Sequence, residues 1–248
     1  MIILKIAVIS GASSGIGKEF AKSLDNYALD EIWLIARNVD KLNNLSSLLK
    51  TKTRLFQLDL LNIESFEEIK KAFKDLNPEI RYLICSAGVG YNGSVNSISE
   101  EEICQTISLN CTALTLLNKI SLNYLSEGSR IINVSSGAAF TPQPYFSVYA
   151  ASKSYVNSFS RALGNELKKK KIYVTTVCPG PVDTPFFSSL DNVKEYKKKF
   201  LISPKKVAIG ALKASKKKKK IYTPTFSMKL VHLLSKILPT SLILKFYK

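Results

Sequence analysis

A tyrosine and a lysine four residues apart, Tyr149 and Lys153, form a pair whose types and spacing could do chemistry. On a helix, positions i and i+4 lie on the same face. An ammonium group beside a phenol favours the phenolate and lowers the pKa of the phenol toward neutral pH. Such a tyrosine would serve as an acid or a base. An ordinary amphipathic helix with one solvated lysine has the same pattern, so the pair alone does not decide.

A glycine-rich segment follows the first apolar run of the chain and reads SGASSGIG, from Ser10 to Gly17. Between a strand and a helix, such a turn lets backbone N–H groups and the helix N-terminus bind a pyrophosphate. In this interpretation Gly11 permits the tight turn, Gly15 the close approach of the ligand, and Gly17 the packing of helix on strand. The segment therefore predicts a dinucleotide site.

The end of the second apolar run indicates which dinucleotide binds. Sites for NAD usually place an acid here, roughly 20 residues after the glycines, to hold the ribose 2′-hydroxyl. This chain has Ala36 there, followed by Arg37. Because a guanidinium pairs bidentately with a 2′-phosphate, Arg37 favours NADP(H) over NAD(H). The alternative is an exposed arginine that begins a loop.

With these features the chain resembles a short-chain dehydrogenase/reductase from residue 4 to about residue 224. Five further segments match that family in order: QLDL ending at Leu60, CSAG ending at Gly88, SLN ending at Asn110, NVSSG followed by YAASK, and CPGPVDT ending at Thr184. The sequence departs from the family at Cys85 and Ser86, where two asparagines are usual.

The resemblance implies an oxidoreductase that moves hydride between a nicotinamide and a carbonyl or secondary alcohol. The implied catalytic residues are Asn110, Ser136, Tyr149 and Lys153. The implied cofactor-binding residues are Gly11, Ser13, Ser14, Gly15, Ile16, Gly17, Arg37, Asp59, Leu60, Ala87, Gly88, Tyr149, Lys153, Pro179, Gly180, Val182 and Thr184. A protein that binds NADPH as a sensor or scaffold, without turnover, is the alternative.

Each implied catalytic residue has a role by this resemblance. Tyr149 would be the general acid or base, and Lys153 would lower its pKa and bind the nicotinamide ribose. Ser136, which lies 13 residues before Tyr149 and is preferred to Ser135, would donate a hydrogen bond to the substrate oxygen. Asn110 would hold a water that links Lys153 to solvent.

The elements that must position these residues follow from the apolar pattern. Apolar runs alternate with helical periodicity, a spacing typical of βαβ units and a parallel sheet. We predict strands at 4–9, 31–36, 54–58, 82–86, 130–135, 172–178 and 220–224. We predict helices at 15–25, 38–49, 64–75, 99–125, 147–170 and 204–215. The fold class is a doubly wound Rossmann-type α/β sheet of about seven strands.

One domain accounts for the chain. Residues 1–224 would form the NADP-binding catalytic domain, and 225–248 an amphipathic extension of the same domain. The apolar start of the chain is interpreted as a buried strand and not as a signal peptide. No run of ~18 uncharged apolar residues predicts a spanning helix. By the resemblance, a homodimer or tetramer would form through the helices at 99–125 and 147–170.

The cysteines and the single histidine limit which catalytic chemistry and which cellular compartment the sequence predicts. The four cysteines include no C-x-x-C pair, which indicates reduced thiols in a cytoplasmic protein. The single histidine, His232, makes a histidine-based triad or a zinc site hard to build, so no metal is predicted.

Charge is unevenly distributed along the chain. Residues 1–150 hold 14 Lys and Arg against 15 Asp and Glu, whereas 151–248 hold 22 against 4, for a net charge of +17. The excess suggests an anionic partner, whether nucleic acid, phospholipid or a phosphorylated cofactor. A solvated lysine-rich surface is the alternative. Without a helix-turn-helix, an aromatic RNA platform or a zinc module, the pattern argues against nucleic acid.

Two segments carry apolar residues that the minimal fold does not require. Residues 184–202 would form a lid over the substrate, either lining a pocket for a hydrophobic ketone or aldehyde, such as a lipid or steroid, or packing on the domain. The residues concerned are Phe186, Phe187, Leu190, Phe200 and Leu201, with Tyr145 and Phe146 nearby.

The tail pattern predicts an amphipathic helix that ends at Pro239. Lysines and His232 lie on one side, and Leu230, Leu233, Leu234 and Ile237 lie on the other. This helix would dock on the domain or on a second subunit, or it would bind an anionic membrane as a peripheral anchor.

Overall fold

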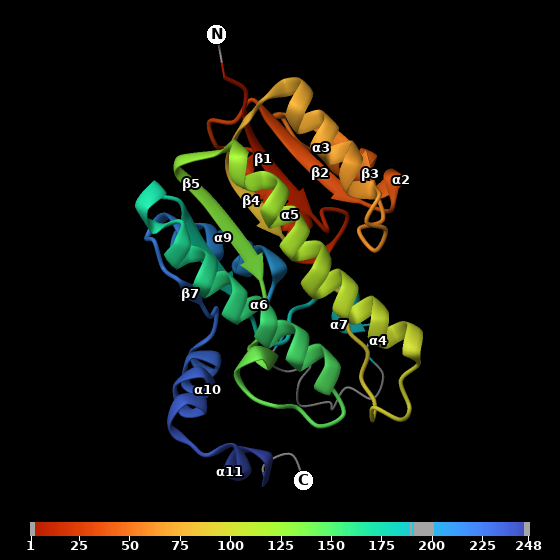
Figure 1. The fold of residues 1–248 in the computed structure, drawn as a ribbon, viewed down its shortest axis with the longest axis vertical. Coiled ribbons are helices and arrows are strands. Elements are labelled where there is room, and N and C mark those ends of the chain that lie inside the picture. The colour runs from red at the N-terminus through yellow and green to blue at the C-terminus, as the bar shows by residue number, and fades with distance from the viewer. Residues whose placement is uncertain (1–2, 189, 191–200, 246–248) are drawn as a thin grey trace.

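The protein is described by a computed structural model that covers residues 3–188, 190 and 201–245. Its centre is a parallel sheet with the strand order β3-β2-β1-β4-β5-β6-β7 (Figure 1). The strands are β1 (Lys5–Ser10), β2 (Glu31–Ala36), β3 (Lys52–Gln57), β4 (Glu79–Cys85), β5 (Leu125–Val134), β6 (Tyr173–Val177) and β7 (Ile221–Tyr222). The predicted fold class is confirmed.

Helices cover both faces of this sheet (Figure 1). One face carries α1 (Gly15–Leu24), α2 (Val39–Ser46) and α9 (Pro204–Lys216), and the other carries α3 (Ser65–Leu76), α5 (Leu114–Ser121) and α6 (Ser147–Glu166). Side chains of β1 alternate between these two cores, with Ile6 and Val8 on the α3 side and Ala7 and Ile9 on the α1 side. Because both faces are buried, the strand is a continuous apolar run.

The predicted helix at 99–125 is not one regular helix. It begins at Ser99 with a capping box to Glu102, continues as α4 (Glu100–Ile107), widens into a π-helical turn (Ser108–Ala113) and resumes as α5. A 3₁₀ turn (Leu122–Tyr124) then leads into β5. A π-helical turn adds a residue to the helical repeat, and such turns occur frequently at functional sites. Here it contains Asn110.

Two strands, β5 and β7, have bounds that differ most from the prediction. The edge strand β7 has two residues, and β5 begins at Leu125, five residues before the predicted start. The other elements of the described residues are 3₁₀ turns at Gly137–Phe140 and Lys168–Lys170, α7 (Pro185–Ser188), α10 (Phe226–Ile237) and α11 (Thr240–Lys245).

The predicted tail helix is present as α10, which begins after the N-cap Thr225 and ends before Pro239. In Figure 1, α10 and α11 extend below the carboxyl ends of the strands. Within the part of the chain that the structure describes, no helix has the length and apolar character needed to cross a membrane.

Candidate active site

The candidate site lies where the central strands end. Because the strands are parallel, the segments that follow β1, β4, β5 and β6 leave the sheet at one edge, the lower edge in Figure 1. The glycine turn, the CSAG segment, Ser136 and the loop that begins at Pro179 therefore meet there. Ligands of open parallel sheets bind at this edge.

The glycine turn adopts a conformation that side chains would prevent. Gly11 has φ of +68° and Gly15 has φ of +52°. A Cβ atom at Gly11 would lie 2.7 Å from the backbone nitrogen of Ala87, and one at Gly17 would lie 2.2 Å from the carbonyl oxygen of Gly11. A Cβ atom at Gly15 would lie 3.0 Å from Cγ2 of Thr184. The turn is thus packed closely against the segment after β4 and against Thr184, at the start of α1, where a pyrophosphate would bind.

The segment that departs from the family is tied to the start of the glycine turn by hydrogen bonds from its backbone N–H groups to a side chain. The hydroxyl of Ser10 accepts hydrogen bonds from the N–H groups of Ser86, at 3.2 Å, and Ala87, at 3.3 Å. Cys85 is buried, and the amide of Asn118 lies 3.4 Å from its sulfur. Local order at this position therefore comes from Ser10 and from neighbouring helices.

Arg37 and Asp59 lie beside each other at the ends of β2 and β3. The guanidinium Nη1 is 3.9 Å from Oδ2 of Asp59, and the two side chains are 72% and 45% exposed. Exposed ion pairs of this length contribute little to stability. Arg37 therefore pairs only loosely and remains available to an anionic ligand, and the adjacent Leu60 is buried.

Asn110 is buried and links three segments of the site. Its amide donates to the carbonyl of Val89 at 2.8 Å and to the hydroxyl of Ser152 at 2.9 Å, and its oxygen accepts from the Val89 N–H at 2.9 Å. The Ser152 hydroxyl in turn donates to the carbonyl of Tyr149 at 2.7 Å. The π-helical turn thus holds α6 against the segment that follows β4.

Tyr149 lies on α6 in a narrow aromatic slot and is 7% exposed. The ring of Phe146 stacks on it at a centroid distance of 4.3 Å, and the ring of Phe186 at 5.4 Å. A Cβ atom at Gly90 would lie 2.3 Å from the Tyr149 ring, so only glycine fits at that position. Sequence reasoning missed Gly90, although its place two residues after Gly88 was a signal.

Lys153 is one turn further along α6, as predicted, and its side chain is buried. Its ammonium donates to the carbonyl of Val134 at 3.2 Å and lies 5.6 Å from the centre of the Tyr149 ring. A Cβ atom at Gly88 would lie 3.1 Å from this ammonium. The two side chains therefore share one face of the helix.

The pKa of Tyr149 is shifted in the direction opposite to the one that the sequence predicted. Burial raises the pKa of Tyr149 to about 12, and a hydrogen bond with Ser136 opposes this rise only in part. Burial lowers the pKa of Lys153 to about 8. Tyr149 therefore does not have the lowered pKa that its spacing from Lys153 predicted, because the loss of solvation on burial prevails.

Ser136 and Ser135 have different environments. The hydroxyl of Ser136 contacts that of Tyr149 and accepts a hydrogen bond from the Ala138 N–H at 3.1 Å. The hydroxyl of Ser135 donates to the carbonyl of Lys153 at 2.7 Å, within the protein. Of the two serines, only Ser136 lies beside the hydroxyl of Tyr149.

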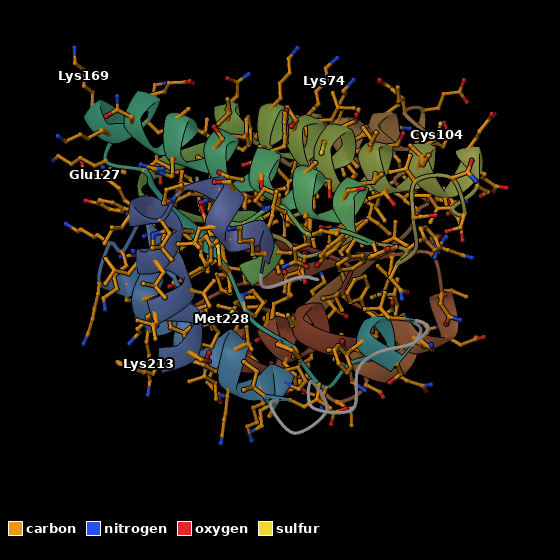
Figure 2. All side chains as sticks on the ribbon, turned by 90° about the horizontal axis from the view of Figure 1, so that it is seen from below. Lys74, Cys104, Glu127, Lys169, Lys213 and Met228 are labelled. Carbon is orange, nitrogen blue, oxygen red and sulfur yellow. The ribbon has the colours of Figure 1, made fainter. Side chains whose placement is uncertain are left out.

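The loop that begins at Pro179 contacts the segment after β5 and the tail helix. The Gly137 N–H donates to the carbonyl of Pro179 at 2.7 Å. A Cβ atom at Gly137 would lie 2.5 Å from the sulfur of Met228, and one at Gly180 would lie 3.2 Å from its Cγ. Met228 belongs to α10 (Figure 2) and was not predicted as a site residue. No sequence motif marks it, because only folding brings the tail to this edge.

Not all of the predicted lid can be placed. Val182 is buried and pairs with Ile202 in an isolated bridge, and Phe187, Leu190 and Leu201 are partly buried. Phe200 lies outside the described residues. Tyr145, in contrast to Phe146, is 70% exposed and has φ of +60°. Among residues 3–188, 190 and 201–245, no cluster of His, Cys, Asp and Glu could hold a metal ion.

Comparisons with known proteins agree with this geometry. Residues 5–195 match the family model of the short chain dehydrogenases. An uncharacterized oxidoreductase of Staphylococcus epidermidis is 31% identical over 189 residues, which are 75% of this chain and 82% of that protein. The 17-beta-hydroxysteroid dehydrogenase type 3 of Mus musculus is 31% identical over 194 residues, 75% of this chain but only 63% of that protein.

Solved structures share the fold. A short-chain dehydrogenase from Sphingobium yanoikuyae in complex with NADPH superposes with a TM-score of 0.80 at 24% identity, covering 95% of this chain and 94% of that one. Other structures of this fold were solved with an NADP derivative or with NAD. Structural similarity alone therefore does not distinguish between the two cofactors.

Proposed function

The chain belongs to the short chain dehydrogenase family, and on this premise we propose that it is an NADP(H)-dependent oxidoreductase that reduces a carbonyl group to an alcohol. The observation that carries the proposal is the contact between the hydroxyls of Ser136 and Tyr149, with Lys153 one turn away and Asn110 behind them. A sensor or scaffold would not need this set of groups.

Each residue of the site would have a distinct role in the reaction. Bound NADPH would supply the hydride. With a pKa of about 12, Tyr149 holds its proton at neutral pH and can donate it to the alkoxide that develops on the substrate. Ser136 donates a second hydrogen bond to the same oxygen, where negative charge accumulates. Lys153 would bind the nicotinamide ribose and favour the phenolate that remains.

The cofactor would lie along the edge of the sheet. The glycine turn, with Ser13, Ser14 and Ile16, would hold the pyrophosphate, and Asp59 the adenine. The segment Ala87–Gly88 and the loop from Pro179 to Thr184 would hold the nicotinamide end. Arg37, exposed at the end of β2, would pair with the 2′-phosphate.

We further propose that the substrate is a hydrophobic ketone or aldehyde. The rings of Phe146 and Phe186 flank Tyr149 and favour an apolar substrate beside the proton donor. A relative named as a hydroxysteroid dehydrogenase points in the same direction. One domain with a C-terminal extension, a homo-oligomer formed through α4, α5 and α6, and a cytoplasmic location stay predictions.

Substitution of the proposed acid tests the function. Tyr149→Phe removes only the hydroxyl, so we expect turnover of a carbonyl panel to fall by about 10²- to 10⁴-fold while NADPH still binds. Turnover is measured as loss of NADPH absorbance, and binding by titration calorimetry. Tyr155→Phe is the matched control, because this tyrosine lies on the same helix and is 43% exposed. Equal turnover by wild type and Tyr149→Phe would refute the assignment.

A charge reversal tests the cofactor preference. Arg37→Asp removes the partner of a 2′-phosphate and adds an acid that suits a ribose hydroxyl, so the ratio of kcat/KM for NADPH over NADH should fall by about 10- to 100-fold. Lys41→Asp, at an exposed position on α2, makes the same change of charge and should leave the ratio near that of wild type. If both variants shift the ratio equally, Arg37 has no specific contact with the phosphate.

A further inference from the structure

An apolar stripe on α10 faces solvent. Its members are large apolar residues with exposed fractions of 39% to 80%: Phe226, Leu230, Leu233, Leu234 and Ile237. At 3.6 residues per turn, they occupy about 100° of the helix circumference. Within the described part of the chain, nothing covers this face. A surface helix normally turns such a stripe toward the core, so this arrangement requires a partner.

The opposite side of α10 holds the helix in this orientation. Met228 contacts Gly137 and Gly180, and the ring of His232 packs edge-on against Phe140 at a centroid distance of 4.2 Å. Both contacts belong to the edge of the sheet where the candidate active site lies. Rotation of the helix to bury its apolar stripe would break these contacts, so the stripe stays outward.

The charge around the stripe indicates what kind of partner would cover it. The two tail helices, α10 and α11, contain three lysines and no acidic residue. Lys229 and Lys236 are exposed and lie along one flank of the stripe, and Lys245 ends α11. A second copy of this chain would bring two lysine-rich faces together, which electrostatic repulsion opposes. An anionic surface with an apolar interior satisfies both the lysines and the stripe.

We propose that α10 lies in the plane of an anionic phospholipid membrane, with its apolar stripe among the acyl chains and its flanking lysines at the headgroups. The helix has 12 residues and is about 18 Å long, too short to span the bilayer but sufficient to lie in its interface. The proposal does not depend on catalysis, because it rests on the exposed stripe and the surrounding charge. It places the sheet edge with the candidate site next to the membrane.

Flotation with vesicles tests this proposal on the full chain. We expect wild type to float with vesicles of phosphatidylglycerol and phosphatidylcholine, and to float far less with phosphatidylcholine alone. The triple substitution Leu230→Ser, Leu233→Ser and Ile237→Ser should lower the partition coefficient by roughly tenfold or more. Raising the salt concentration should also weaken binding, because exposed charges are screened.

A matched control separates the stripe from general surface hydrophobicity. Leu48→Ser with Ile63→Ser removes apolar residues that are 63% and 64% exposed elsewhere on the molecule, and this variant should float like wild type. Failure of wild type to float, or equal flotation of the triple variant, overturns the proposal. Dimerisation in solution that the triple variant abolishes would show that a second copy covers the stripe, and would overturn it as well.

Discussion

Lys153 shows how burial and partners compete at one residue. Its side chain is 4% exposed, and Val134 offers it a single carbonyl at 3.2 Å. The ammonium has exchanged solvent for that one acceptor, so its pKa falls to about 8. A bound dinucleotide would add the ribose hydroxyls that this group lacks. The residue is therefore costly for the fold and suited to a ligand.

The lowered pKa of Lys153 predicts that the stability of the protein depends on pH. Between pH 8 and pH 10.5 the unfolded chain binds a proton at Lys153 and the folded protein does not, so the contribution of Lys153 to the free energy of unfolding rises with pH. The slope should be on the order of 1 kcal/mol per pH unit. The stability of wild type relative to Lys153→Met should therefore rise across this window, as measured by urea unfolding of both proteins at several pH values.

An exposed lysine supplies the comparison for this experiment. Lys213→Met, on α9, should keep the pH dependence of wild type. Because Lys153→Met also removes a buried charge, it should be more stable than wild type at pH 7 and yet lose turnover. If Lys153→Met and wild type show parallel pH profiles of stability, the ammonium is not perturbed as described.

At the scale of elements, the site is held by contacts between segments that are distant in the sequence. The π-helical turn brings Asn110 to Val89 and Ser152, and α10 brings Met228 to Gly137 and Gly180. The tail helix is thus a structural part of the edge that carries the candidate site. A substitution on the inner face of α10 should therefore alter the packing of the loops around Ser136.

A double-mutant cycle measures this coupling. A Cβ atom at Gly137 would lie 2.5 Å from the Met228 sulfur, so Gly137→Ala should lower the free energy of unfolding by about 1 to 3 kcal/mol through overpacking. In a Met228→Ala background the space is open and the cost of Gly137→Ala should largely disappear. Urea unfolding of the four proteins gives the coupling energy.

Gly164→Ala provides the uncoupled reference. A Cβ atom at Gly164 would approach Val174 and not Met228, so its cost should be the same with or without Met228. Additive effects of Gly137→Ala and Met228→Ala would contradict the packing of α10 described here.

At the scale of the whole molecule, the candidate active site and two of the lysine runs lie at opposite edges of the sheet. The lysine runs 168–171 and 216–220 precede β6 and β7, two neighbouring parallel strands, and so lie at the amino edge of the sheet. Lys218 contacts the ring of Tyr173 at 4.6 Å. The candidate site and α10 lie at the carboxyl edge, so the lysines of α10 itself, and not these runs, flank its apolar stripe.

Sequence patterns alone determined much of this protein. Alternation of apolar runs and helical periodicity predicted the parallel sheet, because strands covered on both faces are continuously apolar. The spacing of Tyr149 and Lys153 predicted one helix face, since the period of a helix is local. The glycine turn after β1 was likewise legible, because its conformation depends on the residues themselves.

Only the tertiary structure decided how those residues behave. The pKa directions of Tyr149 and Lys153 depend on burial, which no local pattern reports. The π-helical turn at Asn110 and the position of Met228 depend on contacts between distant segments. The amphipathic pattern of α10 predicted a helix but not which of its sides would face the domain. Local spacing determines which side chains share one face of a helix. Whether that face is buried, and which segments it contacts, depends on solvation and long-range packing, which exist only in the folded chain.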